Sequence, residues 1–119
     1  MHHEKRLARL YEAFNARELD AAIDGLHPDV QWPNGWEGGW LQGREAVRTY
    51  WSRQWQEINP KVDPVGFSRS EENNAVRVTV HQVVRNLAGA ITVDTHVIHT
   101  YQLDDAGLVL RMDIEQPAA

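Results

Sequence analysis

Two polar side chains, Gln82 and His99, interrupt apolar strand faces in the second half of the chain. Side chains alternate across a β-strand, so Gln82 shares its face with Val80. By the same rule His99 shares its face with Val97 and Tyr101. An imidazole takes up and returns a proton near neutral pH, and an amide binds a substrate oxygen. The candidate catalytic residues are therefore His99, which transfers a proton, and Gln82, which orients His99 or holds a substrate oxygen.

The turn between the two strands decides whether Gln82 and His99 meet on one face. A two-residue turn at 88–89, or a four-residue loop, pairs even positions of strand 75–85 with odd positions of strand 90–103. We therefore predict that both side chains lie on the inward face of the sheet. Buried polar groups are costly without partners, so the two residues either satisfy each other or the backbone, or line a cavity.

Apolar and aromatic side chains surround this position on the predicted helix and strand faces. The expected lining of a ligand pocket comprises Tyr11, Phe14, Trp32, Trp51, Trp55, Val80, Val97, Tyr101, Met112 and Ile114. Such residues also build an ordinary hydrophobic core, and His99 fits a core histidine, a pocket contact or an acid–base group. The sequence alone leaves these alternatives open.

Trp36 and Trp40 lie in the glycine-rich segment 33–43, where a core position is hard to arrange. We predict an ordered loop there, with the two indoles forming either a lid over the pocket mouth or a subunit contact.

A second polar cluster, His81, Asp94 and His96, falls on the opposite face of the same strands. Of the histidine pairs, His81 with His96 is better placed than His96 with His99, because residues i and i+3 of a strand point to opposite sides. A solvent-facing or subunit-facing surface explains the cluster without an ion, so we expect no metal site.

Hydrophobic periodicity predicts the elements that must position these residues. A spacing typical of helices covers about 3–16, 19–26 and 44–58, and a short strand covers 29–32. After Pro60 the period changes to two, which predicts strands at about 62–67, 75–85, 90–103 and 108–115 and a hairpin turn at 71–74. Helices followed by an antiparallel meander indicate an α+β fold with the helices on one face of a curved sheet.

Composition limits the remaining choices. The chain has 119 residues, which predicts a single domain over 1–119, and its net charge of −5 comes without a basic patch for nucleic acid. No apolar run approaches the roughly 18 residues of a membrane span, and the start does not look like a signal peptide. The absence of cysteine excludes disulfides and thiolate chemistry and fits a cytoplasmic protein.

Four stretches carry a resemblance to a known superfamily: LYEAFNARELD at 10–20, HPDVQWP at 27–33, GREAVRTYW at 43–51 and YQLDDAGLV at 101–109. In this order and spacing they resemble the nuclear transport factor 2-like (NTF2-like) superfamily. The likeness is strongest to the branch of SnoaL-like polyketide cyclases and ketosteroid isomerase-like proteins, and it covers nearly the whole chain. It implies a cone-shaped fold and a deep apolar pocket between helices and concave sheet. It also implies a homodimer through the outer sheet face near His81 and His96.

The resemblance also implies where catalytic groups would fall. In the steroid isomerases of this group a carboxylate moves the proton, and its position falls on Trp32 here. The position of the hydrogen-bonding acid falls on His99, and that of the tyrosine on Leu10, next to Tyr11. Epoxide hydrolases of the superfamily use a carboxylate on the inner face of the last strand, where this chain has Met112 and Ile114. Both carboxylates are therefore missing, which leaves His99 as the candidate for proton chemistry.

Two functions fit this sequence. One is a cofactor-independent cyclase, isomerase, dehydratase or hydrolase acting on an apolar, oxygen-bearing small molecule, with His99 transferring the proton and Gln82 and a tyrosine, Tyr11 or Tyr101, fixing an oxygen. The alternative is a non-catalytic protein of the same fold that binds an apolar ligand or acts as a dimeric accessory protein.

Overall fold

The chain folds into three helices and six strands in the part that the computed structural model describes, residues 3–69 and 75–116. The elements follow in the order α1 (His3–Asn15), α2 (Leu19–Ile23), β1 (Leu26–Pro33), β2 (Trp40–Gln42), α3 (Arg44–Glu57), β3 (Ile58–Arg69), β4 (Val76–Asn86), β5 (Ile91–Leu103) and β6 (Val109–Glu115). None of these helices is long and apolar enough to cross a bilayer. The α+β prediction is confirmed.

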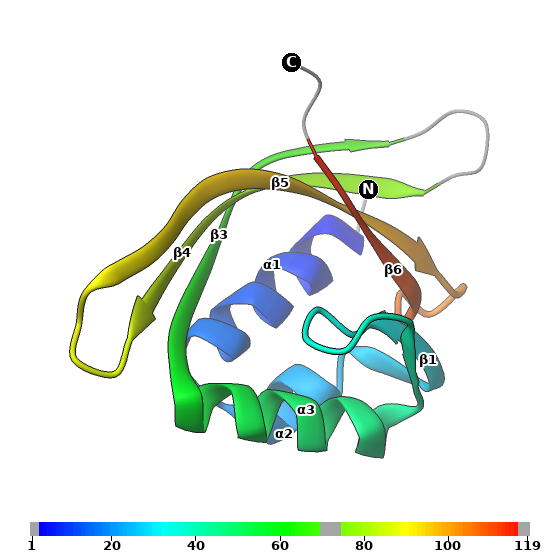
Figure 1. Cartoon of the computed structure of the whole chain (residues 1–119). Coiled ribbons are helices and arrows are strands. Elements are labelled where there is room, and N and C mark those ends of the chain that lie inside the picture. The colour runs from blue at the N-terminus through cyan, green and yellow to red at the C-terminus, as the bar shows by residue number, and fades with distance from the viewer. Residues whose placement is uncertain (1–2, 70–74, 117–119) are drawn as a thin grey trace.

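The strands form one open, curved sheet in the order β2-β1-β6-β5-β4-β3. Its long strands arch over α1, while α2 and α3 lie at the open side of the arch (Figure 1). All neighbouring strands are antiparallel except β1 and β6, which run parallel. The sheet therefore joins the first strand of the chain directly to the last.

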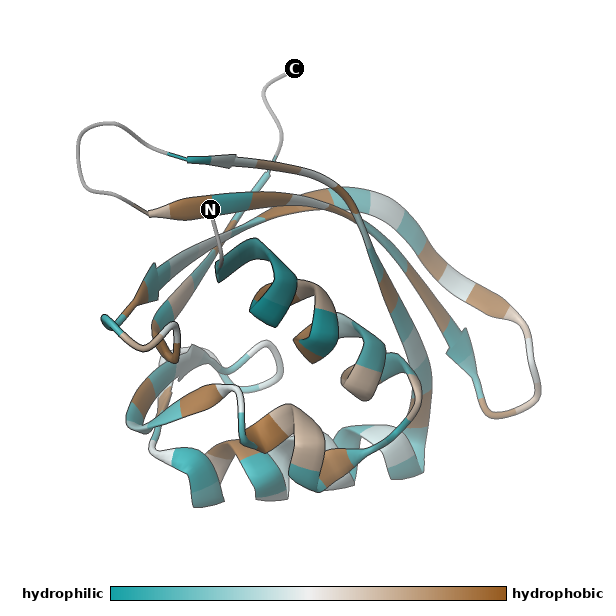
Figure 2. Cartoon of the chain, turned by 180° about the vertical axis from the view of Figure 1, so that it is seen from behind, coloured by the Kyte–Doolittle hydropathy of each residue, from teal (hydrophilic) through white to brown (hydrophobic). Residues whose placement is uncertain are grey.

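The pairing of β4 with β5 confirms the predicted register. Val78 is opposite His99, and Gln82 is opposite Thr95, so Gln82 and His99 share the concave face. Bands of hydrophobic and hydrophilic residues alternate along these strands (Figure 2). The alternation explains why the register is fixed, because a one-residue slip would turn every apolar side chain toward solvent.

Several boundaries differ from the sequence prediction. The second helix ends at Ile23, and Leu26 belongs to β1, where it is buried against the core. Segment 33–43 contains the short strand β2 in addition to a loop. Strand β3 begins at Ile58, directly after α3, and has a register shift between Pro64 and Gly66. The predicted turn at 71–74 lies outside the described residues.

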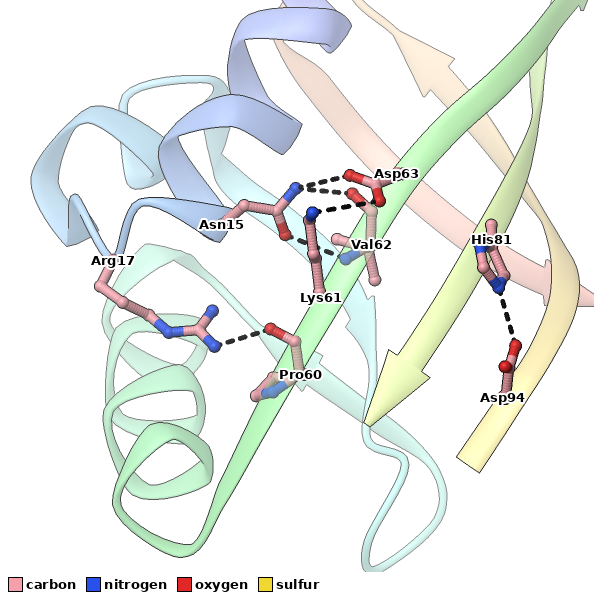
Figure 3. Close-up of polar contacts among 8 residues, drawn as sticks. All are labelled: Asn15, Arg17, Pro60, Lys61, Val62, Asp63, His81 and Asp94. Carbon is pink, nitrogen blue, oxygen red and sulfur yellow. Dashed lines mark hydrogen bonds and ion pairs between the residues drawn. The ribbon is translucent and has the colours of Figure 1, made fainter. Parts of the chain in front are cut away.

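Helix α1 is fastened to edge strand β3 at its C-terminal end (Figure 3). The Asn15 carboxamide donates to the Val62 carbonyl at 2.8 Å and accepts from the Val62 amide at 2.9 Å. Arg17, in the left-handed region at φ 63°, donates to the Pro60 carbonyl at 2.7 Å. These bonds satisfy backbone groups that an edge strand leaves unpaired, and they fix the helix that carries Tyr11 and Phe14 over the concave face.

Candidate ligand pocket

A cavity of about 480 Å³ lies between α1, α3, the loop before β2 and the concave face of the sheet. Its volume falls within the range of about 300–1,000 Å³ typical of small-molecule sites. Both candidate catalytic residues, Gln82 and His99, line it, and so do seven of the predicted wall residues: Tyr11, Phe14, Trp32, Trp51, Tyr101, Met112 and Ile114. The structure therefore brings the polar pair and most of the aromatic residues to one cavity.

Three predicted wall residues lie outside the lining. Val80 and Val97 are buried in the core of the sheet, and Trp55 packs behind the wall with its ring centroid 5.2 Å from that of Phe14. The curvature of the sheet and the position of α1 decide which inward side chains reach the cavity, and alternation along a strand carries no such information.

The two loop tryptophans have different surroundings. Trp36 lines the cavity, with its ring 5.6 Å from that of Tyr50, and it is 40% exposed at the mouth. Trp40 is not among the lining residues, and its ring packs under the Arg111 guanidinium at 4.2 Å. Of the two tryptophans, only Trp36 therefore lies at the mouth of the cavity, where a lid would lie.

Tyr50 and Gln54 line the cavity from α3 and were not among the predicted pocket residues. Both lie within four residues of Trp51, on the helix face that the sequence pattern directs inward. That spacing was the available signal. The remaining lining residues that were not predicted are Leu10, Pro33, Gly35, Ile58, Pro60, Val62, Val84, Thr92 and Val93.

A chain of hydrogen bonds runs through the inner end of the cavity. The Tyr11 hydroxyl lies 2.7 Å from the Tyr101 hydroxyl and 2.8 Å from His99 Nδ1. Tyr101 is 1% exposed, and within the described residues its hydroxyl has no hydrogen-bond partner other than Tyr11. An unsatisfied buried donor is costly, so Tyr101 donates to Tyr11, and Tyr11 in turn donates to Nδ1. His99 then carries its proton on Nε2, the ring nitrogen left for a ligand.

All three members of this chain are uncharged at neutral pH. Burial lowers the pKa of His99 from 6.5 to about 4. Burial also raises the pKa of Tyr101 above its ordinary value, and burial with the adjacent Tyr101 raises the pKa of Tyr11. The inner end of the cavity therefore presents a neutral imidazole N–H as a hydrogen-bond donor.

The rest of the cavity is uncharged as well. Among the described residues that line it there is no aspartate, glutamate, lysine or arginine, and its other polar side chains include Tyr50, Gln54, Gln82 and Thr92. An ionised ligand would lose its hydration there without gaining an opposite charge, which is unfavourable. The pocket is thus suited to neutral molecules.

Gln82 is too far from His99 to orient it. His99 is opposite Val78, four residues along β4 from Gln82, which corresponds to about 13 Å at about 3.3 Å per residue. Tyr11, from α1, is the residue that holds the imidazole. Two roles were considered for Gln82: orienting His99 and binding a ligand oxygen. The geometry is compatible only with the second.

On the outer face of the sheet, the rings of His81 and His96 stack with centroids 4.9 Å apart. His81 Nε2 lies 2.7 Å from an Asp94 carboxylate oxygen (Figure 3). Within residues 3–69 and 75–116, no group of three or more histidine, cysteine, aspartate or glutamate side chains is arranged to hold a metal ion.

The curved sheet, the helices that cover it and the pocket between them define the NTF2-like class of α+β proteins. A sequence model of the SnoaL-like domain matches residues 7–112, and the chain therefore belongs to the SnoaL-like family. No curated protein sequence matches it significantly.

Solved structures share the fold at low sequence identity. An NTF2-like protein of unknown function from Burkholderia pseudomallei is 20% identical, with a TM-score of 0.82 over 98% of this chain and 92% of that one. The epoxide hydrolase/cyclase-like enzyme SalBIII, of salinomycin pyran ring formation, is 15% identical, with a TM-score of 0.81 over 97% and 90% of the two chains. RV0760c from Mycobacterium tuberculosis, in complex with estradiol-17beta-hemisuccinate, is 15% identical, with a TM-score of 0.77 over 90% and 87%. At these identities the likeness establishes the fold.

Proposed function

We propose that this protein binds a neutral, largely apolar small molecule and holds one of its oxygen atoms with the Nε2–H group of His99. The observation that carries the proposal is the chain from Tyr101 through Tyr11 to His99 Nδ1, which fixes both the orientation and the tautomer of the imidazole. The uncharged lining, which includes the indoles of Trp32 and Trp51, supports the apolar character of the ligand. A relative of the same fold is known with estradiol-17beta-hemisuccinate, which supports a small-molecule role.

The same donor would also suit catalysis. A fixed N–H group stabilises negative charge that develops on a carbonyl oxygen, as in the formation of an enolate. With a pKa of about 4, His99 is a weak base at neutral pH, so the donor role is favoured over proton abstraction. As a second candidate function we propose a cyclase- or isomerase-type reaction in which His99 polarises the substrate carbonyl and a water molecule takes the proton that leaves the adjacent carbon. A specific observation favours the non-catalytic alternative: the described lining residues include no carboxylate base.

Para-acetylbiphenyl, a neutral aromatic ketone, tests binding directly. We expect it to bind, with its carbonyl stretching band shifted to lower frequency by the hydrogen bond from His99. His99→Leu removes the donor and should weaken binding about tenfold while abolishing the shift. His99→Gln keeps an N–H donor and should retain part of the shift. Calorimetry and infrared spectroscopy give the two measurements, and failure to bind, or a band unchanged by His99→Leu, contradicts the proposal.

Exchange of the acetyl methyl protons in deuterated water separates the enzyme from the alternative. A catalytic pocket should accelerate this exchange, and His99→Leu should abolish the acceleration. Equal rates with and without protein would support the non-catalytic binder.

We further propose that the protein forms a homodimer through the outer face of the sheet, around His81 and His96. The exposure of Asp94 and His96 and the partial exposure of His81 support this, because these side chains are free to contact a second copy of the chain.

A further inference from the structure

We propose that the natural ligand carries two oxygen functions, one at each end of an apolar body, and that Gln82 binds the end remote from His99. This inference rests on the proposed function, because it assumes a ligand already held at His99. It adds the length and the polarity pattern of that ligand.

The two polar ends of the cavity, at Gln82 and His99, are far apart. Gln82 and His99 lie on the same face and line the same cavity, yet about 13 Å of strand separates them. The inward positions between them are Val80 and Val97, which are apolar and buried. A ligand that reaches both ends must therefore be elongated, with one polar group at each end.

The Gln82 carboxamide has hydrogen-bonding groups that the described residues leave unused. Within the described residues, the Gln82 carboxamide has no hydrogen-bond partner, although the residue is half-buried. The carboxamide of Asn15, in contrast, is satisfied in both directions by the Val62 backbone. An amide offers two donors and one acceptor, and removing it from water without partners is unfavourable. A ligand hydroxyl or carbonyl at this end would supply the missing partner.

The cavity has an aromatic wall that limits the shape of its ligand. The wall is aromatic: the rings of Phe14 and Trp51 meet edge to face at 5.3 Å, and those of Trp32 and Trp51 at 5.2 Å. Aromatic walls of this kind favour flat ring systems. The ligand class is thus a neutral, elongated ring compound with an oxygen at both ends.

Gln54 provides a matched control. It also lines the cavity without a hydrogen-bond partner among the described residues, but it comes from α3 on the opposite wall. Replacing either glutamine by methionine keeps a side chain of similar length and removes the amide. The two variants therefore differ only in which wall loses its polar group.

The test compares para-acetylbiphenyl with its derivative that carries a hydroxyl on the far ring. In the unmodified protein the added hydroxyl should strengthen binding about tenfold, the range of one satisfied hydrogen bond. In Gln82→Met this gain should disappear, while the affinity for para-acetylbiphenyl and its carbonyl shift stay unchanged. In Gln54→Met the gain should persist. Calorimetry of the two ligands against the three proteins gives all six affinities.

The outcomes separate this inference from the proposed function. If para-acetylbiphenyl binds with its carbonyl shifted but the hydroxyl adds nothing, the two-ended ligand is wrong and the role of His99 stands. If the gain survives Gln82→Met or disappears in Gln54→Met, the assignment to Gln82 is wrong. If para-acetylbiphenyl fails to bind, the proposed function itself fails.

Discussion

His99 owes its chemistry to one contact that joins residues 88 positions apart, the bond from the Tyr11 hydroxyl to Nδ1. Strand alternation was enough to predict that His99 and Gln82 point to the same face. It could not predict that a tyrosine from the first helix holds the imidazole, because that contact depends on where α1 lies over the sheet. The same limit explains why Gln82 was considered as the residue that orients His99.

At the residue scale, the depressed pKa of His99 makes stability depend on pH. Because the folded pKa of about 4 lies below the unfolded value of 6.5, the unfolded chain binds the proton more readily. The contribution of His99 is complete above pH 6.5 and is lost as the pH falls toward 4. The difference corresponds to about 3 kcal/mol at 1.36 kcal/mol per pKa unit. Urea unfolding at several pH values should show the wild type losing this much more stability than His99→Gln. If the free energies of unfolding of the two proteins change in parallel with pH, the predicted contribution of His99 is wrong.

Two elements explain most of the difference between the predicted and the observed fold. The short strand β2 has three residues, none of them fully buried, so its sequence carries little strand signal. The parallel pairing of β1 with β6 depends on residues far apart in the sequence, which periodicity cannot detect. In contrast, α1, β4 and the second half of β5 are strongly patterned, and their buried faces were predicted correctly, whereas residues 91–96 of β5 are exposed on both faces.

At the element scale, the bonds from Asn15 to the Val62 backbone should stabilise the whole fold. Asn15→Leu keeps the size of the side chain but leaves two partly buried backbone groups unpaired. We expect a loss of about 2 kcal/mol in the free energy of unfolding, at about 1 kcal/mol per bond. Urea denaturation measures it, and Glu12→Gln, an exposed change on the same helix, should stay within about 0.5 kcal/mol. If Asn15→Leu changes the free energy of unfolding as little as Glu12→Gln does, the hydrogen bonds from Asn15 to Val62 do not stabilise the fold.

At the scale of the whole molecule, the outer sheet face is where association between two copies is expected. Sedimentation equilibrium should give twice the chain mass of 13.6 kDa. His96→Glu adds a negative charge beside Asp94 on this face and should shift the protein to a monomer, because like charges then oppose each other. Glu57→Gln, at the end of α3, should leave the mass unchanged. A wild-type protein of monomeric mass would contradict the dimer.

The parallel pair β1–β6 has a consequence for how the protein comes into being. Strand β1, which carries Trp32, can pair with β6 only after residues 109–115 have left the ribosome, whereas its other neighbour, β2, follows it closely in the sequence. Pairings so distant along the sequence slow folding, since a large loop must close before the contact is gained. A nascent chain that stops before β6 lacks Met112 as well as the partner of β1. Such a product also lacks Ile114, so we expect the complete cavity lining only after β6 has been made.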